Sequence, residues 1–100
     1  MLEISSTVNG DVNELKLVGR LDVKAAREAE EAFAEAAKSA KNVVLDASEL
    51  DYIASAGLRA LKRLRGDVKA NGGTLTLRGV QDDVMEVFEM TGFAAMLTFE

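Results

Sequence analysis

Hydrophobic and polar residues alternate at the start of the chain, where polar side chains separate Leu2, Ile4 and Val8. A period of two predicts a β-strand with one buried face. The segment "NGD" at Asn9–Asp11 predicts a tight hairpin turn, because Asn and Gly tolerate the positive φ that such turns need. A second strand is expected through the leucines that follow, ending near Gly19.

The hydrophobic period then changes to that of an amphipathic helix, and it does so three times along the chain. Capping residues and glycines bound the three segments. The predicted helices begin at Asp22 as N-cap, near Ala56 and near Gln81, and they end near Ala40, at Asn71–Gly73 and at Gly92.

Three further strands lie between and after these helices. The apolar run "NVVLDAS" at 42–48 is typical of a strand covered on both faces. The segment "TLTL" at 74–77 alternates again, and 96–99 makes a final strand. Parallel strands need crossover helices, and those crossovers are right-handed. The order predicts one domain over 1–100, an α/β sandwich whose mixed sheet has an N-terminal β-hairpin and helices mainly on one side.

Composition narrows the classes of function. The net charge of −5 over 100 residues argues against nucleic acid or an anionic membrane as a partner of the whole surface. No apolar run is long enough for a membrane span and no secretory pattern opens the chain, so we expect a cytoplasmic protein. The chain has no Cys and no His, which removes thiol nucleophiles, structural zinc and the usual general base. We therefore expect no enzyme, no metal and no cofactor.

Small residues crowd the junction before the second helix, in "DYIASAGLRAL" at Asp51–Leu61. Ser55 suits a helix N-cap, and it equally places a hydroxyl where the helix dipole favours a phosphate. Gly57 is unusual early in a helix, since Gly costs about 1 kcal/mol against Ala there. It indicates either a close contact between helix and sheet or a flat patch for a partner's backbone.

Charges divide unequally between the second and third helices. The second bears five basic residues and one acid, whereas the third bears four acids and no base. Such runs are usually solvated faces, but a basic helix in an acidic domain also suits docking to an acidic partner. The basic residues are Arg59, Lys62, Arg63, Arg65 and Lys69.

Three segments together resemble a known family. They are "GRLD" at Gly19–Asp22, "VVLDASELDYIASAGLRAL" at Val43–Leu61 and "VFEMTGF" at Val87–Phe93. In this order and spacing they resemble a STAS domain, and most of all the single-domain anti-sigma-factor antagonists of bacteria. The resemblance spans nearly the whole chain.

The resemblance implies a partner-switching regulator. Such a protein binds an anti-sigma factor that is also a serine kinase with an ATP-binding fold, and the sigma factor is thereby released. The kinase phosphorylates a serine at the start of the second helix, which breaks the complex, and a metal-dependent serine phosphatase resets it. The physics agrees, because a dianion in a tight interface is costly to desolvate and repels nearby carboxylates.

The resemblance also implies which residues act. Relatives often read Asp-Ser-Ser-Gly-Leu, with the phosphorylated serine directly before the glycine, where this chain has Ala56. The chain looks like a variant that reads Ser-Ser-Ala-Gly-Leu, with Ala54 in place of the first serine, so Ser55 becomes the candidate phosphorylation site. Asp22 matches an aspartate beside the phosphorylation loop, where it positions that loop or simply caps its helix. The predicted partner-binding residues are Asp22, Ala54, Ser55, Ala56, Gly57 and Arg59.

Two other readings remain open. The chain is alternatively a STAS scaffold or accessory subunit of a signalling or lipid-transport complex, without phosphorylation. Binding of a small ligand or nucleotide has less support, because no Gly-rich phosphate loop follows a strand. Nothing in the sequence defines an oligomeric state.

Overall fold

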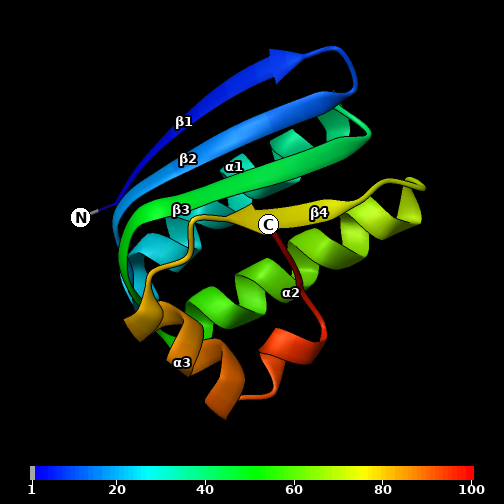
Figure 1. Cartoon of the computed structure of the whole chain (residues 1–100). Coiled ribbons are helices and arrows are strands. Elements are labelled where there is room, and N and C mark those ends of the chain that lie inside the picture. Colours follow the sequence, from blue (N-terminus) through cyan, green and yellow to red (C-terminus); the bar gives the residue numbers. More distant parts are fainter. Residues whose placement is uncertain (1) are drawn as a thin grey trace.

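Five strands lie side by side in chain order and form one mixed sheet (Figure 1), in a computed structural model that describes residues 2–100. Three helices and one 3₁₀ turn connect them. The elements are β1 (Leu2–Asn9), β2 (Val12–Leu21), α1 (Val23–Ser39), β3 (Asn42–Ile53), α2 (Ser55–Ala70), β4 (Leu75–Arg78), α3 (Asp82–Met90), η1 (Phe93–Ala95) and β5 (Thr98–Phe99).

The hairpin and the parallel strands have the predicted arrangement. β1 pairs antiparallel with β2, and Asn9 lies opposite Val12 across a turn in which Gly10 has a φ of +63°. All later neighbours pair in parallel, in the order β2-β3-β4-β5. Right-handed crossovers that always step in the same direction leave their helices on one face of the sheet. The predicted fold class, an α/β domain with a mixed sheet and helices on one side, is confirmed.

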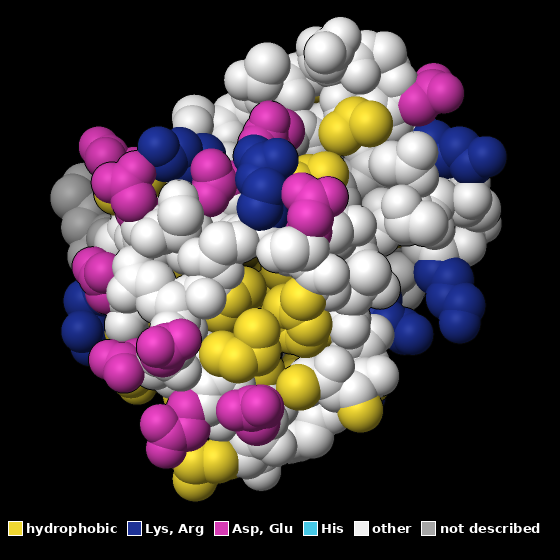
Figure 2. Space-filling view, viewed as in Figure 1, with side chains coloured by type: hydrophobic (Ala, Val, Ile, Leu, Met, Phe, Trp, Pro, Cys, Tyr) yellow, Lys and Arg dark blue, Asp and Glu magenta, His cyan; other side chains and the backbone are white. Residues whose placement is uncertain are grey.

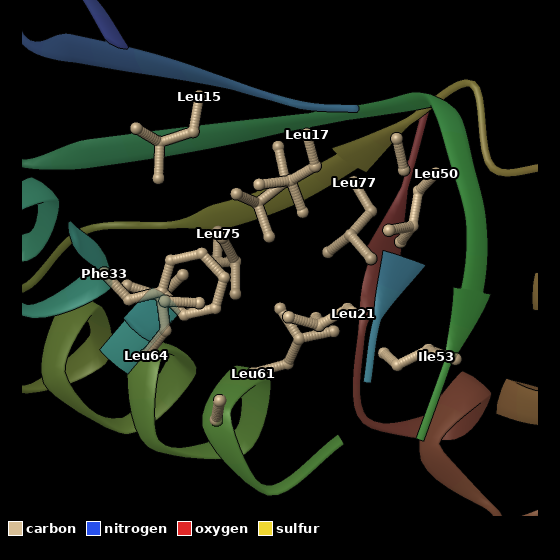
Figure 3. Packing of buried hydrophobic residues seen from close by; sticks show 14 of the residues in the cluster. Leu15, Leu17, Leu21, Phe33, Leu50, Ile53, Leu61, Leu64, Leu75 and Leu77 are labelled. Carbon is tan, nitrogen blue, oxygen red and sulfur yellow. The ribbon is translucent and has the colours of Figure 1, made fainter. Parts of the chain in front are cut away.

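The core lies between this face of the sheet and the helices (Figure 3). Leucines from the strands point toward Phe33 of α1 and toward the leucine stripe of α2, all of them nearly inaccessible to solvent. The stripe predicted for α2 is therefore its buried face. The residues at the centre of this packing are Leu15, Leu17, Leu21, Phe33, Leu45, Leu61, Leu64 and Leu77.

The prediction that β3 is covered on both faces is wrong. Val43, Leu45 and Ala47 are buried, but the residues between them are half-buried and Ser48 is exposed. The reason is that no helix within residues 2–100 covers the second face of the sheet. That open face carries ion pairs instead, in which Arg78 contacts both Glu14 and Asp46.

Several element ends also differ from the prediction. β2 continues to Leu21 and β3 to Ile53, with irregular register between them. The last strand is only Thr98–Phe99, because the amides of Met96 and Leu97 donate to the Phe93 carbonyl in the turn that follows η1. On β1 only part of the inner face is covered, since Val8 is 52% exposed. β2 and β3 are thus longer than predicted, and both of them end at the candidate site.

A buried polar side chain ties the hairpin to α1. Asn13 is 3% exposed, and its side-chain amide donates to the Ser39 hydroxyl over 2.8 Å. Its side-chain oxygen accepts from the Ser6 hydroxyl over 2.7 Å. Asn13 therefore links β1, β2 and the end of α1, and both ends of its amide are satisfied.

Candidate functional site

The candidate site forms where β2 and β3 end at the same edge of the sheet. Leu21 lies opposite Ile53, and the Ala54 amide donates to the Leu21 carbonyl over 2.9 Å. The start of α1 at Asp22 thus lies next to the turn that opens α2. We call Ala54–Gly57 the junction turn. Parallel pairing brings these two segments together although about thirty residues separate them in sequence.

The junction turn places Ser55 on the surface at the first position of α2. Ala54 has extended backbone angles and is the N-cap, and its carbonyl accepts the first helical bond from the Leu58 amide over 3.0 Å. The interpretation of Ser55 as the N-cap is therefore wrong, because the bond between Ala54 and Leu21 fixes the cap one residue earlier. No side chain caps this helix, and Ser55 is exposed.

Gly57 lies beneath the junction turn rather than on its surface. It is buried, and a Cβ at this position would lie 2.8 Å from Cγ of Leu21 and 2.9 Å from Cγ1 of Ile53. Real Cβ atoms do not approach other atoms this closely, so a larger residue here would force Leu21 or Ile53 to shift. This contact favours the close-packing interpretation of Gly57 over the interpretation as a flat surface patch.

Asp22 caps α1, as predicted. Its Oδ1 accepts from the Ala25 amide over 2.8 Å, and its backbone is extended as expected for an N-cap. The carboxylate is half-buried at the same edge of the sheet as the exposed Ser55. Beyond the capping bond, the carboxylate has further lone pairs that can accept hydrogen bonds.

The three helix starts differ in charge. α1 begins at the capping carboxylate of Asp22, and α3 has Asp82 and Asp83 in its first turn. The first turn of α2 has neither an acid nor a side-chain cap. The positive end of its dipole is therefore the least compensated, and it is the one that would gain most from an anion.

Side chains that sequence reasoning missed flank the junction turn. The Arg20 guanidinium lies over the Tyr52 ring, 4.3 Å from its centroid. Arg20 and Tyr52 face each other one residue before the ends of β2 and β3. Tyr52 is 40% exposed, and Val23, directly after Asp22, is 63% exposed. The Arg20–Tyr52 pairing depends on two register shifts that no local pattern reveals. Val23 lies off the helical spacing of the buried residues Ala26, Ala29 and Phe33, and this spacing is the signal in the sequence that could have located it.

Perturbed ionisation occurs away from the junction turn, on the open sheet face. Hydrogen bonds from Ser48 hold the pKa of Asp46 below its usual value, and Glu49 raises the pKa of Lys16. Within residues 2–100, no group of three or more acidic side chains is arranged to hold a metal ion. No helix in the same range has the length and apolar character needed to cross a bilayer. Neither Asp46 nor Lys16 belongs to the junction turn.

The fold and the junction turn define a class of small α/β domain with a mixed sheet, and comparison with known proteins gives its family. The family model of the STAS domain matches residues 3–100, so the chain belongs to the STAS domain family.

Individual relatives are similar over much of this length. BtrV of Bordetella bronchiseptica, which by name belongs with the anti-sigma factor antagonists, is 42% identical over 66 residues, or 66% of this chain and 57% of BtrV. The chain thus matches less than two thirds of that relative. Among solved structures, an anti-sigma-factor antagonist domain of Planctomyces limnophilus has a TM-score of 0.87 at 20% identity, covering 100% of this chain and 90% of the other. Phosphorylated SpoIIAA of Bacillus has a TM-score of 0.75 at 16% identity, covering 100% and 91%.

Proposed function

We propose that this chain is an anti-sigma factor antagonist without enzymatic activity, acting in the cytoplasm. It binds an anti-sigma factor that is also a serine kinase with an ATP-binding fold, and so frees a sigma factor. The observation that carries the proposal is the exposed hydroxyl of Ser55 at the uncapped start of α2, at the edge where β2 and β3 end, in a STAS chain.

The binding surface in this proposal is the edge formed by the junction turn and the start of α1. The small side chains of Ala54 and Ala56 leave this edge without protruding groups, and the buried Gly57 lets α2 approach the strand ends. Val23 and Tyr52 add exposed apolar area at its sides. A flat surface with a few apolar groups and one carboxylate, that of Asp22, suits a protein partner better than a small ligand.

Phosphorylation of Ser55 is the proposed control. A phosphate adds about −1.5 to −2 charges, which the free amides at the start of α2 and Arg59, one turn later, would accommodate. The fold would tolerate the modification. A partner packed on Ala54 and Ala56 would not, because it would have to desolvate the dianion. A serine phosphatase would then restore binding.

The test is a phosphorylation assay with the anti-sigma kinase of the same organism and ATP, read by intact-protein mass spectrometry. We expect one added phosphate, absent in Ser55→Ala and retained in Ser48→Ala, a matched change at another exposed serine. Unmodified protein should bind the kinase, and phosphorylated protein should not. Phosphate on another residue, or none while the kinase binds, would disprove control through Ser55. No binding at all would disprove the antagonist function.

A second candidate is a STAS scaffold or accessory subunit that is never phosphorylated. The observation that favours it is Ala56, which stands where many relatives carry the modified serine. Under this alternative, binding to the partner is the same with and without ATP, and Ser55→Asp leaves it unchanged. Neighbouring genes for a sigma factor, kinase and phosphatase would favour the switch, whereas transporter genes would favour the accessory subunit.

A further inference from the structure

The exposed face of α2 carries a row of cations that begins at Ser55. At 3.6 residues per turn, Ser55, Arg59, Lys62, Gly66 and Lys69 lie along one side of the helix, opposite the buried leucine stripe, and Arg63 lies at its margin. All six of these residues are exposed. We define the basic row as Arg59, Lys62, Arg63 and Lys69.

The cations of the basic row are not used for folding. Among residues 2–100, ion pairs within 4 Å involve only the cations Lys16 and Arg78, both on the open sheet face. Arg63 borders a hollow that is also lined by Glu30, Glu31 and Asp67, so its charge is partly offset. Unpaired cations on one face are available to an anionic partner.

Gly66 is a second and independent sign of contact. It lies within the basic row, where Gly costs about 1 kcal/mol relative to Ala. A Cβ at this position would meet nothing within 4 Å, so packing inside the protein does not require the glycine. Because Gly66 has no side chain, the surface of α2 is recessed between Lys62 and Lys69, and the backbone of a partner can approach there.

The charge around the basic row limits the kind of partner. The chain as a whole carries −5, so the surface outside the row is more acidic still. Figure 2 shows carboxylates gathered over α3, and α3 itself has four acids and no base. From Arg59 to Lys69 the row is about 15 Å long at 1.5 Å per residue. A discrete acidic patch on a protein matches this area, whereas a DNA duplex or an anionic membrane would also face the acidic surroundings.

We propose that the basic row docks an acidic surface of the protein that binds the junction turn, so that one partner covers both. The identity of that partner rests on the proposed function. The arrangement also connects docking with control, because phosphate on Ser55 would lie one turn from Arg59 and would pair with it. Phosphorylation would then both place a dianion in the interface and withdraw the first cation from the partner's carboxylates.

The experiment compares two charge reversals with the same change in net charge. Arg59→Glu with Lys62→Glu alters the basic row, and Arg27→Glu with Lys41→Glu alters exposed cations elsewhere. The kinase that phosphorylates Ser55 is the probe, and its association rate is measured at about 50 mM and about 500 mM salt. We expect the row variant to associate at least about tenfold more slowly at low salt, and the control less than about threefold. Circular dichroism verifies that both variants are folded.

Equal association rates for the two variants would overturn the proposed docking surface. If the kinase still phosphorylated Ser55 in that case, the proposed function would stand. If no kinase binds, the proposed function fails and a decaglutamate peptide becomes the probe, with amide shifts recorded by NMR. Shifts concentrated on the basic row would support the inference, and shifts elsewhere or none would overturn it. Stronger binding of the row to a DNA duplex or to phosphatidylglycerol vesicles than to the peptide would also overturn it.

Discussion

Gly57 packs directly against Leu21, and this contact holds the junction turn close to the end of β2. We predict that Gly57→Ala destabilises the protein, because its Cβ would lie 2.8 Å from the Leu21 side chain and 3.0 Å from the Leu21 carbonyl oxygen. Overpacking typically costs about 1–3 kcal/mol, which offsets or exceeds the gain in helix propensity of about 1 kcal/mol. Urea unfolding measures the net effect.

Gly66→Ala is the matched control on the same helix. No atom lies within 4 Å of its added Cβ, so only the gain in helix propensity remains. The free energy of unfolding should rise by about 0.5–1 kcal/mol. If Gly57→Ala stabilised the protein as much as Gly66→Ala does, the close contact with Leu21 would not hold in solution.

Negative charge at Ser55 should affect stability and binding in opposite directions. Ser55→Asp places a carboxylate in the only one of the three α-helix starts that has neither a side-chain cap nor an acid. We predict a gain of about 0.3–1 kcal/mol in the free energy of unfolding, smaller at high salt, together with weaker partner binding. Thermal unfolding at two salt concentrations measures the gain. Ser55→Asn separates charge from side-chain size.

Asp22 has one role in the fold and a proposed role in binding, and two substitutions separate them. Asp22→Ala removes the capping bond to the Ala25 amide and should cost about 0.5–2 kcal/mol. Asp22→Asn keeps a capping oxygen and should cost little in urea unfolding. If Asn preserves stability but weakens partner binding, the charge of Asp22 acts in the interface. If both variants bind normally, Asp22 is only a cap.

Asn13 is predicted to be essential for attachment of the hairpin to α1. Asn13→Ala removes the acceptor for Ser6 and the donor to Ser39, at a position with 3% exposure. Removing a buried hydrogen-bonding group typically costs about 1–3 kcal/mol. Ser6→Ala, which loses one bond at an exposed residue, should cost less. Hydrogen exchange should become faster in β1 before it does in β3.

The bonds between Ser48 and Asp46 predict a pH dependence. Ser48 donates from its hydroxyl and its amide, which holds the pKa of Asp46 below the ordinary value of 3.8 in the folded state. The stability gained from the charged carboxylate is therefore present above the unfolded pKa and is lost as the pH falls through the folded one.

Ser48→Ala tests this dependence. The stability difference between wild type and variant should be largest near neutral pH and should shrink in acid. NMR titration should show the pKa of Asp46 rising in the variant. Ser5→Ala on β1, another exposed serine, should show no such pH dependence. A difference that stays constant into strong acid would contradict the prediction.

Local patterns predicted most of this fold correctly, because each acts over a few residues. Turn chemistry at Asn9–Asp11, helical spacing and the capping carboxylate of Asp22 are all local signals, and the structure confirms them. The single-sided packing of the helices followed from the handedness of crossovers. The family resemblance added the position of Ser55 at the start of α2, where the structure has it.

The predictions that were wrong concern features that depend on tertiary contacts. The segment 42–48 is apolar enough for a strand with two covered faces. The sequence of the strand does not determine whether a second layer of helices covers the sheet. Ser55 is a good N-cap by residue type, yet the bond from Ala54 to Leu21 takes precedence. The Arg20–Tyr52 contact depends on register shifts between β2 and β3, which arise only when the two long strands pair.

Tyr52 gives the protein its own spectroscopic probe. It is the single tyrosine of a chain that has no tryptophan, and it lies on the last strand residues before the junction turn, beneath the Arg20 guanidinium. Ultraviolet emission from the unlabelled protein therefore originates at one corner of the molecule. Binding of a partner that has neither tryptophan nor tyrosine could therefore be followed at that corner in real time without attaching a dye.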